Sequence, residues 1–173
     1  RKERNDNGFF ADIETYFAHM HRAPASVNHA ILCGHTNLRH AVMDDLSRPA
    51  NDDEIRQMCE LLASALAEGA LGLSTGLYYA PANAASTDEV IAVSKTLQRF
   101  NGLYVTHMRD EEDHVTSSLK ETFRIGRAAG VPVIVSHHKC VSAANHGKSA
   151  VTLKMIDEAR QSQAAGQSRS HVS

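Results

Sequence analysis

Two stretches decide the fold: Gly102-Leu-Tyr-Val-Thr-His-Met-Arg-Asp-Glu111 and, about thirty residues further on, Val131-Pro-Val-Ile-Val-Ser-His-His-Lys-Cys140. In each, a short apolar and β-branched run ends on a histidine, and helix-like sequence separates the two runs, as in a βαβ unit. Consecutive parallel strands usually lie side by side, about 4.8 Å apart. The sequence therefore predicts that His107 and His137 share one rim of a parallel sheet, within reach of one metal ion.

The same alternation of strand and helix extends along the chain. Strands are predicted to begin near residues 28, 70, 102 and 131, with helical sequence after each. Capping boxes open two of the helices, at Asn51-Asp-Asp-Glu54 and Ser86-Thr-Asp-Glu89. The pattern predicts an α/β fold with a parallel sheet covered by helices. Eight such units would close a barrel, and four make half of one.

Composition limits the domain organisation and the kinds of partner. The chain has 173 residues, enough for one domain with a real core, which we assign to residues 1–160; the Ser- and Gln-rich stretch 161–173 is expected to be a disordered tail. The net charge is −2, with 18 basic and 20 acidic residues spread throughout, which argues against a nucleic-acid or anionic-membrane partner.

Hydropathy and cysteine content bear on location. No apolar run approaches the about 18 residues of a membrane span, and no hydrophobic segment follows the charged N-terminus. The three cysteines form no C-x-x-C pair and are odd in number, which is typical of a reducing compartment. We therefore expect a cytoplasmic protein.

The chemistry of a catalytic zinc sets the next requirement. Such an ion takes three protein ligands and leaves one position for water. His107 and His137 supply two ligands, and spacing singles out none of the candidates for the third, which are His35, His138, Asp110 and Glu111. Asp110 and Glu111 are also candidates for the general base. The alternative for both is a solvent-exposed charge at the start of a helix.

Two further features have a functional and an ordinary interpretation. Lys139 projects from the same rim and could bind an anionic group of a substrate, or it could be a solvent-exposed lysine. His19-Met-His21 would be a metal signature on a strand. On the helix predicted here, residues two apart point about 200° from each other, which argues against a shared ion.

Four stretches together are recognisable: Gly34-His-Thr-Asn-Leu-Arg39, Gly69-Ala-Leu-Gly-Leu-Ser-Thr-Gly-Leu-Tyr-Tyr-Ala-Pro81, Tyr104-Val-Thr-His-Met-Arg-Asp-Glu111 and Val133-Ile-Val-Ser-His-His-Lys139. They resemble the N-acyl-D-amino-acid deacylases, or D-aminoacylases, of the amidohydrolase superfamily. The resemblance runs from about residue 9 to residue 159. It implies a distorted (β/α)₈ barrel, of which the four strands would be the third to sixth. It also implies zinc-dependent hydrolysis of the amide of a small N-acyl-D-amino acid.

The resemblance implies roles residue by residue. His107 and His137 correspond to zinc ligands of the family, and Tyr79 and Lys139 to residues that hold the substrate. Arg109 is a further candidate for positioning the substrate. The family's H-x-H on the first strand, its N-C-G cysteine on the second and its catalytic aspartate on the eighth have no counterpart here. We therefore expect the catalytic aspartate to lie outside this chain, and the chain alone to be inactive.

Two alternatives stay open. One is a catalytically dead α/β fragment that binds metal or partner chains and self-associates through its open sheet edges. The other is a different amidohydrolase, such as a dihydroorotase or a dipeptidase, which the T-H-M-R-D-E and S-H-H-K blocks disfavour.

Overall fold

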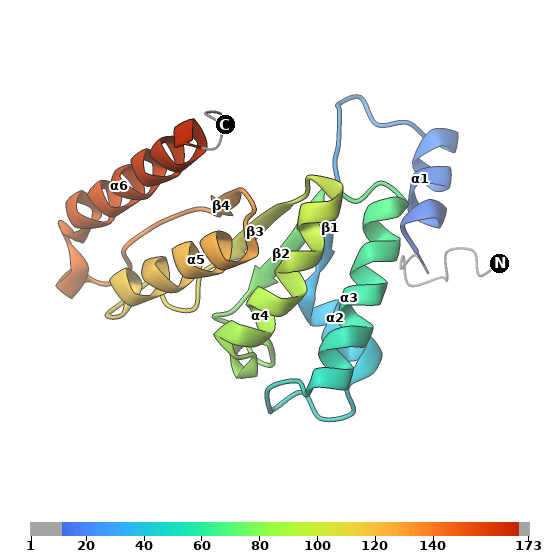
Figure 1. Ribbon diagram of the computed structural model, residues 1–173, viewed down its shortest axis with the longest axis horizontal. Helices are drawn as coiled ribbons and strands as arrows, with labels where there is room; N and C mark the ends of the chain where they lie inside the picture. The colour runs from blue at the N-terminus through green and yellow to red at the C-terminus, as the bar shows by residue number, and fades with distance from the viewer. Residues whose placement is uncertain (1–11, 170–173) are drawn as a thin grey trace.

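Four parallel strands form the centre of the molecule. The computed structural model describes the backbone of residues 12–169 and the side chains of residues 12–162 (Figure 1). The strands are β1 (Leu32–Gly34), β2 (Gly72–Gly76), β3 (Leu103–His107) and β4 (Val133–Val135), and they pair in the order β1-β2-β3-β4. Every pairing is parallel. The predicted parallel α/β sheet of four strands is confirmed.

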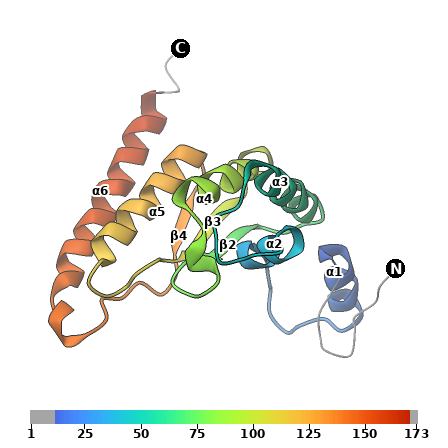
Figure 2. The ribbon, with the colours of Figure 1, turned by 90° about the horizontal axis from the view of Figure 1, so that it is seen from below.

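Helices connect the strands and extend beyond the sheet at both ends. The α-helices are α1 (Ile13–Arg22), α2 (His35–Val42), α3 (Asp52–Ala67), α4 (Thr87–Ser94), α5 (Val115–Ala129) and α6 (Lys148–Arg169). The 3₁₀ segments are η1 (Ala82–Ala84), η2 (Lys95–Phe100) and η3 (Ala143–Asn145). Figure 2 shows α3, α4 and α5 together on one face of the sheet. The crossovers between successive strands therefore run over the same face, as in one arc of a (β/α) barrel.

The first strand is shorter than the sequence predicts. Pairing with β2 starts at Leu32, opposite Gly72, instead of near residue 28. Residues 27–30 are exposed, and the side chain of Val27 is 73% exposed. The apolar residues in this stretch find no sheet partner, so only the last few residues of the run become a strand.

The two predicted capping boxes have different outcomes. At Asn51, the side chain accepts from the backbone N–H of Glu54, and the Glu54 carboxylate accepts from the backbone N–H of Asn51. At Ser86, the hydroxyl accepts from the backbone N–H of Glu89, but the Glu89 carboxylate does not return the bond. The prediction is wrong for the second half of this box, because the Glu89 carboxylate accepts from Arg39 and from the backbone N–H of Ala50.

Side chains of β3 alternate between a covered face and an open face. Tyr104 and Thr106 point toward the helices and are fully buried. The core on that side contains Met58, Leu62, Leu73, Val90, Leu97 and Ile125. Leu103, Val105 and His107 alternate with them on the opposite face and are only partly buried. The strand therefore places His107 at its carboxyl end, on the face that the helices leave open.

The sheet has two outer edges. Within residues 12–169, no strand pairs with the outer edge of β1 or of β4, and Ile134 on β4 is 50% exposed.

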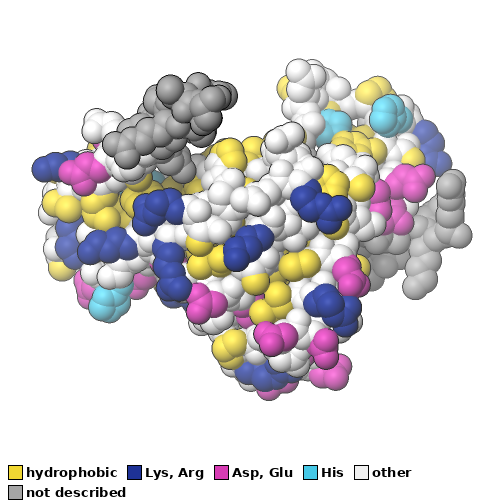
Figure 3. Space-filling model, in the orientation of Figure 1, with side chains coloured by type: hydrophobic (Ala, Val, Ile, Leu, Met, Phe, Trp, Pro, Cys, Tyr) yellow, Lys and Arg dark blue, Asp and Glu magenta, His cyan; other side chains and the backbone are white. Residues whose placement is uncertain are grey.

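Basic and acidic side chains both occur across the face seen in Figure 3. None of the helices in the described part of the chain is both long enough and apolar enough to cross a membrane.

The last helix is longer than the sequence predicts. It continues to Arg169, although the apolar spacing ends near residue 160, so the backbone of residues 161–169 is helical where a tail is expected. Residues 170–173 and residues 1–11 lie outside the described residues. The division into a partial barrel at 1–160 and a separate tail stays a prediction.

Candidate metal centre

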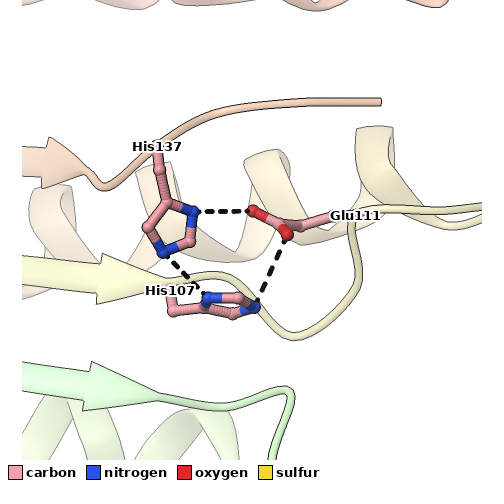
Figure 4. A group of neighbouring side chains, drawn as sticks. All are labelled: His107, Glu111 and His137. Carbon is pink, nitrogen blue, oxygen red and sulfur yellow. Dashed lines mark hydrogen bonds and ion pairs between the residues drawn. The ribbon is translucent and has the colours of Figure 1, made fainter. Parts of the chain in front are cut away.

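The two histidines meet at the carboxyl end of the sheet. His107 is the last residue of β3, and His137 follows β4 by two residues. Their ring centroids are 4.6 Å apart, and Nδ1 of His107 lies 3.0 Å from Nε2 of His137 (Figure 4). The parallel pairing of β3 with β4 produces this approach, because it brings both strand ends to the same rim.

The backbone turns sharply at His137. Its φ is 37°, in the left-handed region that non-glycine residues rarely adopt. Strained positions of this kind cost on the order of 1–3 kcal/mol and cluster at functional sites. The next residue, His138, directs its ring to α6, where Nε2 lies 2.8 Å from the hydroxyl of Thr152. His138 is therefore not a third ligand beside His137.

Glu111 completes the group. Its buried carboxylate places Oε2 3.5 Å from Nε2 of His107 and Oε1 3.4 Å from Nδ1 of His137 (Figure 4). The ammonium of Lys139 forms a short ion pair with Oε2. Among the described residues, His107, Glu111 and His137 are the group of possible ligands whose atoms all lie within 4.8 Å of one another. Of the four candidates that sequence spacing left equal, Glu111 is therefore the one that the structure brings into contact with the histidine pair.

The other two candidates are engaged elsewhere. The ring of His35 is fully buried against Glu89, with Nε2 3.1 Å from its carboxylate. Oδ1 of Asp110 accepts from the backbone N–H groups of Glu112 and His114, at 2.7 and 3.0 Å. Asp110 therefore stabilises the turn before α5, and neither residue reaches the histidine pair.

The geometry of the histidine pair fits a metal ion. Two imidazole nitrogens on one tetrahedral zinc, each about 2.0–2.1 Å from the ion, would lie about 3.3 Å apart, close to the 3.0 Å seen here. A histidine ligand must also be neutral. Burial lowers the pKa of His107, and the neighbouring His137 and Lys139 lower it further against the opposing effect of Glu111, which favours the neutral ring. Imidazole and carboxylate donors suit zinc and neighbouring transition metals.

Two tyrosines form a wall beside the pair. Tyr78 and Tyr79 follow β2, and their ring centroids lie 5.6 and 4.9 Å from that of His107. The two tyrosine rings pack edge to face, with centroids 5.2 Å apart, and both stay exposed by about half. They line one cavity together with Glu111 and Lys139. The predicted Tyr79 and Lys139 thus adjoin the site. Tyr78 was not selected, although the adjacent tyrosine is a signal for it.

Arg109 is fixed within the protein. Its guanidinium forms two hydrogen bonds with the carboxylate of Glu121, from Nε at 3.0 Å and from Nη2 at 2.8 Å. It also donates to the backbone carbonyls of Asn83 and Ala85, at 2.9 and 3.0 Å. These bonds tie the loop after the tyrosines to α5. A direct contact of Arg109 with substrate stays a prediction.

Comparison with known proteins gives close relatives. A D-aminoacylase from Alcaligenes xylosoxydans xylosoxydans is 49% identical over 150 residues, which are 87% of this chain and 30% of that protein. A D-aminoacylase structure with a binuclear metal centre matches 91% of this chain and 34% of its own, with a TM-score of 0.87 and 47% identity. A zinc- and inhibitor-bound N-acyl-D-glutamate deacylase from Bordetella bronchiseptica matches 91% of this chain and 33% of its own, with a TM-score of 0.86 and 37% identity. No protein-family model matches.

These similarities agree with the site. The parallel sheet, with imidazoles at adjacent strand ends, matches part of a D-aminoacylase structure that belongs to the amidohydrolases, with a TM-score of 0.87 and 48% identity. The chain is similar to a D-aminoacylase, an N-acyl-D-aspartate deacylase and an N-acyl-D-glutamate deacylase, at 40–49% identity. It spans about a third of the length of the relatives that it matches.

Proposed function

We propose that this chain is the metal- and substrate-holding part of a zinc-dependent enzyme that hydrolyses the amide bond of N-acyl-D-amino acids. The observation that carries the proposal is the approach of His107 Nδ1 and His137 Nε2 at the ends of β3 and β4. The match to a deacylase whose structure contains zinc and a mimic of the tetrahedral intermediate supports zinc as the metal.

The residues of the site have separate proposed roles in binding the metal and the substrate. His107 and His137 would hold the zinc, which supplies Lewis-acid activation of water and of the amide carbonyl when bound. Lys139 is half exposed at the rim, where its ammonium can bind the carboxylate of an amino-acid product or substrate. Tyr78 and Tyr79, both about half exposed, offer flat apolar surface and two hydroxyl groups for the rest of the substrate.

Hydrolysis also requires a group that accepts the proton of the attacking water. Among residues 12–162, Glu111 is the carboxylate that contacts the histidine pair, and it already holds Lys139 and both imidazoles. We infer that a longer protein supplies the catalytic carboxylate, and that the chain alone does not turn over substrate. The alternative is a catalytically dead fragment that binds metal and self-associates through the outer edges of β1 and β4, and self-association stays a prediction.

A chimera tests the proposed function. Residues 12–162 of this chain would replace the matching segment of the D-aminoacylase that is 49% identical, and amine release would be followed with N-acetyl-D-amino acids. We expect zinc-dependent hydrolysis within about tenfold of the parent, because the two histidines, the tyrosine wall and Lys139 would all be supplied by this segment.

The enantiomeric substrates and one variant serve as controls. N-acetyl-L-amino acids should be hydrolysed at least about 100-fold more slowly, and a chimera carrying His137→Ala should be inactive. A chimera that folds and binds zinc but releases no amine from any N-acyl-D-amino acid would favour the catalytically dead fragment.

We also infer a cytoplasmic location. All three cysteines are free in the structure, which supports a reducing environment.

A further inference from the structure

Glu111 contacts both proposed metal-binding imidazoles and the ammonium of Lys139. Its carboxylate is 5% exposed and lies between one nitrogen of His107, one nitrogen of His137 and the ammonium of Lys139. Figure 4 shows that the remaining nitrogens of the two rings face each other, away from the carboxylate. We propose that Glu111 is a positioning residue that orients both metal-binding imidazoles and is not itself a metal ligand.

Two places for a cation are possible in this arrangement. On one side of the rings, Glu111 would be a third ligand beside His107 Nε2 and His137 Nδ1. On the other side, only His107 Nδ1 and His137 Nε2 face the ion. The Lys139 ammonium already occupies the first side, because it pairs with Glu111 Oε2 and lies 3.2 Å from His137 Nδ1. A divalent cation there would be repelled, so the second side is the metal side.

Hydrogen-bonding needs of the buried atoms point the same way. Glu111 Oε1 and His107 Nε2 are buried and have no hydrogen-bond partner at normal distances. The nearest complementary atoms are His137 Nδ1 for the oxygen and Glu111 Oε2 for the nitrogen, each about 0.5 Å beyond an ordinary N–H···O hydrogen bond. A small movement would give both Glu111 Oε1 and His107 Nε2 a hydrogen bond if the two rings carry their protons on the nitrogens that face Glu111.

This assignment fixes the tautomer of each ring. His107 is protonated on Nε2 and His137 on Nδ1, and the lone pairs of His107 Nδ1 and His137 Nε2 then face each other across 3.0 Å. Facing lone pairs repel, and a bound cation removes the repulsion. Carboxylates that accept the second N–H of a ligating histidine fix its tautomer and raise its basicity, and here one carboxylate serves two rings.

Lys139 is the competing partner. If its ammonium donated to His137 Nδ1, that ring would carry its proton on Nε2 and could not bind a metal through that atom. That form keeps the 3.0 Å contact between the rings and the 3.2 Å contact of Lys139 as hydrogen bonds, but it leaves Glu111 Oε1 buried with no partner. His137 and Lys139 are half exposed and can replace a lost hydrogen bond with water, whereas the buried Glu111 carboxylate cannot, and we therefore assign Glu111 as the acceptor.

The inference rests on the proposed metal site, but its first test needs no metal. Long-range ¹H–¹⁵N correlation spectra of the histidine-labelled chain at pH 8 report the tautomer of each ring. We expect the Nε2–H form for His107 and the Nδ1–H form for His137, and loss of both preferences in Glu111→Gln. The opposite tautomer at either ring in the unmodified chain would overturn the proposal. If the tautomers are as expected and zinc does not bind, the metal site fails while the role of Glu111 stands.

Zinc titration gives the second test. Glu111→Gln should bind zinc about 10- to 100-fold more weakly, while Glu112→Gln, an exposed neighbour with the same loss of charge, should match the unmodified chain. Zinc should shift the ¹⁵N resonances of His107 Nδ1 and His137 Nε2. Equal affinity in Glu111→Gln, or shifts at the other two nitrogens, would contradict the assignment.

A further variant covers the case in which Glu111→Gln does not fold. Lys139→Met keeps the carboxylate and removes the competing donor, so both tautomers should persist and zinc affinity should be unchanged or higher. A switch of His137 to its Nε2–H form in Lys139→Met would show that Glu111 does not set the ring.

Discussion

Replacing His107 with alanine should weaken zinc binding to this chain by more than about 100-fold. The variant removes one of the two facing nitrogens, Nδ1 of His107, and leaves His137 Nε2 as the single metal-binding nitrogen of the pair. Loss of a ligand costs more than the about 10- to 100-fold that loss of an orienting neighbour costs. Isothermal titration of the purified chain with zinc measures the change, and His137→Ala should show an equal loss.

The matched control is His114→Ala. His114 is exposed just before α5, on the same loop as Glu111, and its side chain makes no capping hydrogen bond. Its removal should leave the zinc affinity within about twofold. If His107→Ala and His114→Ala behaved alike, the rim of β3 and β4 would not be the zinc site.

Replacing Glu89 with alanine should lower the free energy of unfolding by about 3–5 kcal/mol, because it leaves a buried charge without its partner. The side chains of Glu89 and Arg39 are both fully buried, and Oε1 lies 2.5 Å from Arg39 Nη1 and 3.1 Å from His35 Nε2. Oε2 accepts from the backbone N–H of Ala50 at 2.8 Å. Chemical denaturation measures the loss.

The adjacent residue provides the control. Asp88 pairs with Arg124 at 2.6 Å, but its carboxylate is 80% exposed. Exposed pairs contribute about 0–1 kcal/mol, so Asp88→Ala should be nearly neutral. Equal losses in the two variants would mean that the buried network does not stabilise the fold.

The pH dependence of stability follows from the same network. Burial alone would raise the pKa of Glu89, but hydrogen bonds from His35, the Ala50 N–H and Arg39 outweigh it and lower the pKa below 4.5. A carboxyl with a lowered pKa in the folded state contributes stability that is fully present above its unfolded pKa. That contribution is lost as the pH falls through the folded pKa. Glu89→Gln should therefore flatten the loss of stability below about pH 4.5.

Local periodicity was sufficient to predict the sheet and the histidine pair. Apolar runs that end on His107 and His137 one βαβ unit apart place both rings at one rim, because parallel strands in sequence order become neighbours. The start of β1 was misplaced because the apolar pattern does not reveal where a strand finds its partner. Pairing begins only at Leu32.

Long-range contacts explain what the sequence could not provide. Glu89 has the spacing of a capping-box residue, yet its carboxylate binds Arg39, which lies fifty positions earlier in the chain. Glu111 and Asp110 were equivalent by position after β3. The turn before α5 directs Asp110 to backbone N–H groups and Glu111 to the imidazoles. Such choices depend on the loop geometry, which no local pattern encodes.

The most direct measurement is the position of zinc in crystals of this chain, located by anomalous scattering at the zinc absorption edge. We expect one strong peak between the ends of β3 and β4, about 2.0–2.1 Å from both His107 Nδ1 and His137 Nε2. No peak at this rim, with zinc bound at other histidines or not at all, would contradict the metal centre on which the proposed deacylase function depends.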